Sequence, residues 1–151
     1  MLDDNYFMGL AIGQARQAAD VAEVPIGAIL VIGDQIYSCQ ANERETRNDP
    51  TAHAEILALR HAAETLGNWR LVESTMYVTA EPCVLCSGAL YLARVKRVVL
   101  GCPNPKGGAL RFIQEHEKTL GLNHTIDVVG GVRELECAQL LKEFFQHRRG
   151  K

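Results

Sequence analysis

Hydrophobic positions along this chain follow a helical period in some segments and a strand period in others. Apolar side chains recur at helical spacing across residues 4–20, which predicts an amphipathic helix. Residues 26–32 are apolar and branched, and Gly33-Asp34 then turns the chain into residues 35–41, which predicts a β-hairpin. The chain is therefore expected to begin with a helix and two antiparallel strands.

The rest of the chain alternates between helical and strand-like segments. The predicted helices cover residues 51–66, 83–93, 109–120 and 134–148, and the predicted strands cover residues 76–79, 95–100 and 125–129. Gly67 is a natural C-cap, and residues 103–108 are rich in Pro and Gly, as is typical of a loop. This order predicts a single layered α/β domain over residues 1–151, with a sheet that is antiparallel at its start and parallel at its end.

Composition changes this prediction little. A chain of 151 residues can bury its own core, and 47% hydrophobic content is ordinary for a globular protein. No apolar run approaches the ~20 residues that span a membrane, and the acidic residues 1–5 do not resemble a signal peptide. Of the five cysteines, Cys39, Cys102 and Cys137 are expected to be reduced, mostly buried thiols in a cytoplasmic protein.

The formal charge of −2 argues against a generic nucleic-acid binder, but the charges are unevenly distributed. Residues 1–50 carry three bases against eight acids, whereas residues 94–111 carry five bases and no acid, and residues 142–151 have a net charge of +3. These two basic segments suit a polyanion laid across one face. The alternative for Arg94 and Arg97 is that they only solvate a helix end and a strand start.

Two short motifs carry the candidate chemistry, His53-Ala54-Glu55 and Pro82-Cys83-x-x-Cys86. One imidazole and two thiolates can hold a zinc ion and leave its fourth position for water, which is the arrangement of a catalytic zinc. The carboxylate of Glu55 can then move protons for that water. His-x-Glu together with Pro-Cys-x-x-Cys is the signature of zinc-dependent nucleobase deaminases.

The residues around the motifs predict that both sit at helix starts. Asp49 can cap a helix whose first turn contains Pro50. Glu81-Pro82 has the same order of an acidic residue and a proline just before the cysteines. Helix N-termini favour anions and lower thiol pKa values. A lone Cys-x-x-Cys is also compatible with a redox pair or half of a structural zinc site, so the catalytic interpretation depends on the full set of residues.

The motifs and the order of elements resemble the cytidine deaminase superfamily, and the remaining sequence resembles its bacterial tRNA adenosine deaminases. The matching stretches cover residues 23–28, 42, 49–55, 77–83, 123–124, 136–137 and 144–145. The resemblance implies a three-layer α/β/α sandwich with a mixed five-stranded sheet. It also implies hydrolytic deamination of adenosine to inosine at the tRNA wobble position, by a cytoplasmic homodimer that binds the anticodon stem-loop.

Residue roles carry over from the same resemblance. It implies one Zn²⁺ per chain on His53, Cys83 and Cys86, with Glu55 as the proton shuttle. The substrate-binding residues it implies are Asn42, Ala54, Asn104, Lys106 and Phe145. From the residues alone, Asn42 could simply end a strand and Phe145 could belong to the core.

Two departures from the family pattern concern the predicted RNA-contacting loop. Asn104 replaces a usual Asp, and Leu110-Arg111-Phe112 replaces a usual Gly-Ser sequence. They leave open a deaminase of a free base or nucleoside, such as guanine or cytosine. A third hypothesis is a zinc-stabilised RNA-binding module without catalysis, which would have no need of Glu55 beside an open zinc position.

Overall fold

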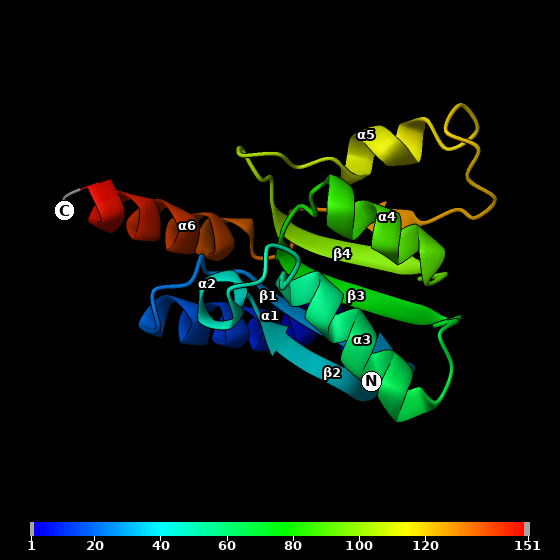
Figure 1. Cartoon of the computed structure of the whole chain (residues 1–151), viewed down its shortest axis with the longest axis horizontal. Helices are drawn as coiled ribbons and strands as arrows, with labels where there is room; N and C mark the ends of the chain where they lie inside the picture. The colour runs from blue at the N-terminus through cyan, green and yellow to red at the C-terminus, as the bar shows by residue number, and fades with distance from the viewer. Residues whose placement is uncertain (1, 150–151) are drawn as a thin grey trace.

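The computed structural model describes residues 2–149, which form one sheet flanked by helices (Figure 1). The helices are α1 (Asp4–Asp20), α2 (Arg44–Arg47), α3 (Ala54–Leu66), α4 (Val84–Leu92), α5 (Leu110–Glu115) and α6 (Glu134–Arg149). The strands are β1 (Gly27–Ile32), β2 (Gln35–Ala41), β3 (Ser74–Ala80), β4 (Arg97–Cys102) and β5 (Asp127–Val129). None of the helices in this described range is long and apolar enough to cross a membrane.

The five strands lie in the order β2-β1-β3-β4-β5. Strand β1 is antiparallel to both β2 and β3, whereas β3, β4 and β5 run parallel to one another. The mixed five-stranded sheet predicted from the sequence is confirmed. Because parallel strands end at the same edge, β3 and β4 deliver the segments that follow them to one side of the molecule.

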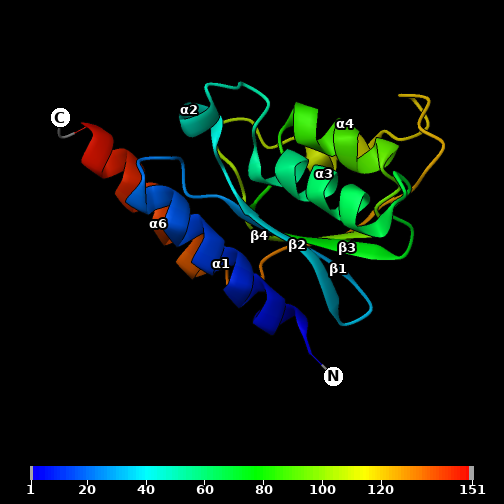
Figure 2. The same ribbon diagram turned by 60° about the horizontal axis from the view of Figure 1, so that its bottom comes forward.

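Helices cover both faces of the sheet, so the three-layer prediction is also confirmed. Helices α1 and α6 pack on one face, and α3, α4 and α5 pack on the other (Figure 2). Alternate residues of β1 face opposite layers, with Ala28 and Leu30 toward α3 and Ile29 and Val31 toward α1. All four are buried, as expected for a central strand with helices on both sides.

A glycine decides how closely α1 approaches the sheet. A Cβ on Gly27 would collide with the backbone carbonyl of Ala11 in α1. Gly27 therefore permits α1 to lie directly on the start of β1. The preceding residues, Val24 and Ile26, can then reach the edge of the sheet where the candidate site lies.

The strand boundaries differ from the predicted ones by about two residues at most, and the largest differences are at two helices. The helix predicted from residue 51 begins at Ala54, because Asp49 caps a turn instead, accepting hydrogen bonds from the Thr51 amide and hydroxyl at 2.8 Å each. The helix predicted over residues 109–120 ends at Glu115 and continues as turns. Cys39 is exposed rather than buried, whereas Cys102 and Cys137 are buried as expected.

The sequence pattern did not reveal α2, which is only four residues long. The buried carboxylate of Glu23 holds it, accepting hydrogen bonds from the amides of Glu45 (3.0 Å) and Thr46 (2.6 Å). Burial alone would raise the pKa of Glu23, but these hydrogen bonds lower it overall. The contact spans more than 20 residues of sequence, so local periodicity does not report it.

Candidate active site

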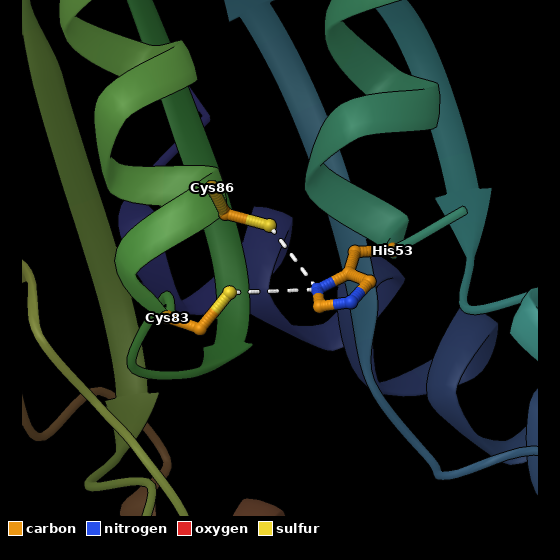
Figure 3. Close-up of side chains that lie close together, drawn as sticks. All are labelled: His53, Cys83 and Cys86. Carbon is orange, nitrogen blue, oxygen red and sulfur yellow. Dashed lines mark hydrogen bonds between the residues drawn. The ribbon is translucent and has the colours of Figure 1, made fainter. Parts of the chain in front are cut away.

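The N-termini of α3 and α4 lie side by side at the carboxyl edge of the parallel strands (Figure 3). His53 is the residue immediately before α3, and Cys83 immediately precedes α4. Cys86 follows one helical turn later and is buried. The fold thus brings together the three predicted ligands from two segments 30 residues apart.

The geometry of these three side chains fits a single metal ion. The Nδ1 atom of His53 is 3.6 Å from Cys83 Sγ and 3.4 Å from Cys86 Sγ. All three ligand atoms lie within 4.8 Å of one another. A tetrahedral zinc with a nitrogen at about 2.0 Å and a sulfur at about 2.3 Å separates the two atoms by about 3.5 Å. The donor set and spacing therefore suit zinc.

Proton sharing among the three groups already favours one thiolate. A hydrogen bond from Cys86 lowers the pKa of the Cys83 thiol to about 3. The same hydrogen bond, together with burial, raises the pKa of Cys86. The pKa of His53 is raised because it is hydrogen-bonded to Cys83. A dication between the sulfur atoms would stabilise both as thiolates.

Glu55 lies in the first turn of α3 and is only 3% exposed. Burial raises the pKa of its carboxyl to about 7. A carboxyl that titrates near neutral pH can both accept and return a proton under ordinary conditions. Its place beside the ligand cluster matches the role predicted for a proton shuttle.

A cavity of about 360 Å³ opens beside the cluster. It lies where β2, β3 and β4 end and β1 begins, and α6 closes its far side. Its walls contain the predicted residues Asn42, His53, Ala54, Glu55, Cys83, Asn104, Lys106 and Phe145. Cys86 is the one predicted site residue that does not line it, because this ligand is buried behind Cys83.

Asn42 directly follows β2 and lines the cavity. Its Nδ2 donates to the Val24 carbonyl at 3.3 Å, and its Oδ1 accepts from the Arg44 amide at 3.2 Å. These two bonds fix the orientation of the side-chain amide. One N–H and one lone pair of the amide remain for a ligand.

Phe145 likewise has two roles, since it packs against the core near α1 and also lines the cavity. The ammonium group of Lys106 lies 4.0 Å from the centre of its ring. This cation–π contact joins the loop after β4 to helix α6 across the cavity mouth.

The basic side chains of segment 94–111 do not lie on one surface of the molecule. Lys96 forms an ion pair with Glu73, and Arg97 forms one with Asp4. Both pairs lie near the N-terminal ends of the parallel strands, whereas the cavity lies at their C-terminal ends. The expectation that the whole segment faces one polyanion is therefore wrong. Arg111 also points elsewhere, with its guanidinium against Gly130, and Lys106 is the one basic residue of this segment that lines the cavity.

Two further cations line the cavity, Arg148 and Arg44. Arg148 belongs to the basic segment 142–151 that was expected to face a polyanion, whereas Arg44 was not predicted. Arg44 follows Asn42 by two residues, which is the one local hint that it belongs to the site. Neither it nor Lys106 or Arg148 forms an ion pair within the described residues 2–149. Three unpaired cations from three different elements thus surround the mouth of the cavity.

The same features occur in known proteins. A family model for MafB19-like deaminases matches residues 2–149. A tRNA-specific adenosine deaminase of Bacillus subtilis (strain 168) is 44% identical over 151 residues, covering 100% of this chain and 94% of the relative. This chain belongs to the tRNA-specific adenosine deaminase family. The family recognised in the sequence is confirmed, and with it a deaminase activity.

Solved structures separate this family from its neighbours. A structure from work on A-to-I editing by tRNA:A34 deaminases at the wobble position has a TM-score of 0.82 at 41% identity, covering 89% of this chain and 98% of that chain. A guanine deaminase from Nitrosomonas europaea has a TM-score of 0.78 but only 20% identity, covering 95% and 85%. The second likeness shows a shared fold alone, so the free-base alternative is the more distant one.

Proposed function

We propose that this protein hydrolyses adenosine to inosine at the wobble position of a tRNA anticodon, using one Zn²⁺ per chain. The observation that carries the proposal is a buried Glu55 beside the cluster of His53, Cys83 and Cys86, within a family of tRNA-specific adenosine deaminases. A single deaminase domain over residues 1–151 would perform the reaction in the cytoplasm.

The zinc ligands would be His53 Nδ1 and the two sulfur atoms of Cys83 and Cys86. A Zn²⁺ ion held there brings the pKa of a water molecule to about 7 and so supplies a nucleophile at neutral pH. The two thiolates balance the charge of the ion, and their placement at a helix N-terminus supports their ionised form.

Glu55 would move every proton in the reaction. It takes a proton from the attacking water as oxygen bonds to adenine C6, and delivers it to ring N1. Glu55 would then carry the second proton of the attacking water from the new C6 hydroxyl to the exocyclic amino group. The C6–N bond breaks and ammonia leaves, so one water enters and one ammonia departs. The pKa of about 7 supports a group that alternates between base and acid.

The cavity walls would bind the extruded nucleotide. Asn42, Ala54 and Asn104 all line the cavity. Asn42 would offer its amide to the base, Ala54 would leave space next to the zinc ligand, and Asn104 would contact the ribose. The three unpaired cations at the cavity mouth, Arg44, Lys106 and Arg148, would contact phosphates. Phe145 would stack on a neighbouring base of the anticodon loop.

The family resemblance implies a homodimer, and we also propose that the two chains associate through an apolar groove between α3 and α4. The groove has a volume of about 320 Å³ and is lined mainly by Ile56, Leu59, Ala63, Trp69, Leu71, Ala89, Leu92 and Ala93. Trp69 and Leu92 are 55% and 71% exposed, so a second chain would remove apolar surface from water.

Light scattering should give twice the mass of one chain at micromolar concentration. Leu92→Glu should shift this equilibrium to the monomer, because the carboxylate would be buried at the interface without a partner. The matched control is Leu135→Glu, since Leu135 is 86% exposed on α6 at the other face of the sheet. A monomeric wild-type protein would contradict the proposal.

Direct assay tests the substrate. The zinc-loaded protein is incubated with an anticodon stem-loop carrying A34, and with guanine, cytosine and adenosine, each at two salt concentrations. Inosine reads as guanosine in cDNA, so conversion appears as an A-to-G change at position 34. Turnover of guanine or cytosine without conversion of the stem-loop would favour the free-base alternative, and stem-loop binding without turnover would favour the RNA-binding module.

A further inference from the structure

The loop that carries Asn104 and Lys106 to the cavity is held by the segment that precedes the first zinc-binding cysteine. The amide of Glu81 donates to the Cys102 carbonyl at 2.9 Å, and the amide of Ala109 donates to the Pro82 carbonyl at 2.9 Å. These bonds tie both ends of residues 103–108 to Glu81-Pro82. The substrate loop and the zinc-binding segment therefore form one unit.

The Glu81 carboxylate adds a contact that backbone geometry alone does not provide. Its Oε2 accepts a hydrogen bond from the Arg111 amide at 2.9 Å, at the start of α5. Its Oε1 lies only 2.5 Å from the position that a Cβ on Gly108 would occupy. The carboxylate thus fills the space under the loop, and a glycine at position 108 makes room for it.

Asn104 completes the attachment from the side of the loop. Its Oδ1 accepts from the Lys106 amide at 3.0 Å, and its Nδ2 donates to the Glu81 carbonyl at 3.4 Å. Because the Lys106 N–H can only donate, its partner must be the Oδ1 of Asn104, and the Nδ2 of Asn104 therefore faces the Glu81 carbonyl. An aspartate in place of Asn104 could not donate to the Glu81 carbonyl, so this bond requires the amide.

The loop has few other anchors. Pro103, Pro105, Lys106 and Gly107 are all exposed, and Gly107 adopts a positive φ of 124°. An exposed loop with few internal contacts is held mainly by its ends. Any group that fixes those ends therefore controls where Lys106 stands relative to Phe145 and the cavity mouth.

We propose that Glu81 is a positioning residue for substrate binding, which holds the loop of Asn104 and Lys106 over the cavity through the Arg111 amide. The proposal rests on the proposed function, because it assumes that this loop contacts the RNA. Glu81 itself lies outside the cavity walls and touches no reacting group.

Kinetics on the A34 stem-loop tests this role in the zinc-loaded protein. Glu81→Ala should raise KM about tenfold with kcat within about twofold, the effect of losing one charge-assisted hydrogen bond that positions a binding group. Glu81→Gln keeps a carbonyl oxygen for the Arg111 amide and should recover most of the affinity. Zinc content should be unchanged in both, and Glu115→Ala on the exposed side of α5 is the matched control.

A double-mutant cycle with Gly108 gives a sharper test. Gly108→Ala should raise KM by itself, because the new methyl group displaces the Glu81 carboxylate. Gly108 does not have a positive φ, so backbone strain does not contribute to that effect. In the Glu81→Ala background the clash with Oε1 is gone, and the nearest remaining atom is the Asn104 carbonyl oxygen, 3.1 Å from the Cβ position. Gly108→Ala should therefore raise KM much less in this background than in the wild-type protein. Fully additive effects would overturn the proposal.

Amide hydrogen exchange supplies a readout that does not depend on activity. Exchange at Arg111 and across residues 104–109 should be faster in Glu81→Ala and unchanged in Glu115→Ala. Wild-type protein that fails to convert the stem-loop would refute the proposed function. Active wild-type protein whose Glu81→Ala variant keeps a normal KM, with or without faster exchange, would refute the positioning role alone.

Discussion

At the scale of single residues, Glu55 is the group on which the proposed chemistry depends. Its carboxyl is buried beside the ligand cluster, and its environment brings its pKa close to neutrality. A structural zinc site needs no such group. Substitution of this one side chain therefore separates catalysis from metal binding.

Glu55→Gln should retain zinc and fold but lose deamination by at least 10²- to 10⁴-fold, about the range for removing a general acid–base group. The amide has nearly the same shape but cannot carry the proton. Elemental analysis and circular dichroism verify the metal and the fold, and single-turnover conversion of the stem-loop measures the rate. Near-normal turnover would mean that another residue is the shuttle.

Asp4 provides a second test at this scale, through the pH dependence of stability. It accepts hydrogen bonds from Arg97 and from Tyr77 (2.8 Å), and the Arg97 contact in particular lowers its pKa. A carboxyl with a lowered folded-state pKa stabilises the fold fully above its ordinary value of about 3.9, and loses that contribution as pH falls through the folded value.

Asp4→Asn should therefore lower the melting temperature at neutral pH and flatten its fall below about pH 4. The effect should be modest, because both partners are about one-third exposed and water screens the pair. Thermal melts of both proteins from about pH 2 to pH 7 measure it across the range in which carboxyls titrate. Equal differences in melting temperature at every pH would contradict the assigned ion pair.

At the scale of secondary-structure elements, the site depends on two helices that begin at the same place. Helices α3 and α4 each start directly after a proposed zinc ligand, and neither has a side-chain N-cap. A dication held at this point would join the starts of the two helices. Metal binding should therefore contribute to folding as well as to catalysis.

Cys83→Ala should lose zinc and stability together. Its melting temperature should fall to that of chelator-treated wild-type protein, and chelator should then have no further effect on the variant. Cys39→Ala is the matched control, because Cys39 is exposed on β2 and should keep both metal and stability. Full zinc occupancy in Cys83→Ala would rule out Cys83 as a ligand.

At the scale of the whole molecule, the fold gathers three positive charges from distant parts of the sequence at one site. Arg44, Lys106 and Arg148 come from α2, the loop after β4, and α6, yet they meet at one cavity mouth. Other bases pair with acids at distant edges of the molecule. A net charge of −2 is thus compatible with a local basic surface.

Arg44→Gln combined with Arg148→Gln should weaken binding of the stem-loop and flatten its salt dependence, by about 0.7 in the log–log slope per lost phosphate contact. Lys96→Gln, at the opposite edge of the sheet, should leave the slope unchanged. Filter binding at several salt concentrations measures both. An unchanged slope in the double variant would remove these two side chains from the RNA interface.

The motifs, the alternation of helices and strands, and the helix starts to within a few residues could all be predicted from the amino-acid sequence. His-x-Glu and Cys-x-x-Cys are local patterns, and so are the periodicities of α1 and of the β-hairpin. The resemblance to a deaminase family depends on the same short-range information, because each matching stretch is only a few residues long.

The sequence did not predict which charged residues share a surface or which carboxylates hold loops in place. These contacts are visible in the folded structure alone. Glu23 fixes α2 across more than 20 residues of sequence, and Glu81 reaches Arg111 across 30. The same holds for Arg97, whose partner Asp4 is 93 residues away. Contacts of this kind follow from how layers pack on the sheet, and no local period or spacing encodes them.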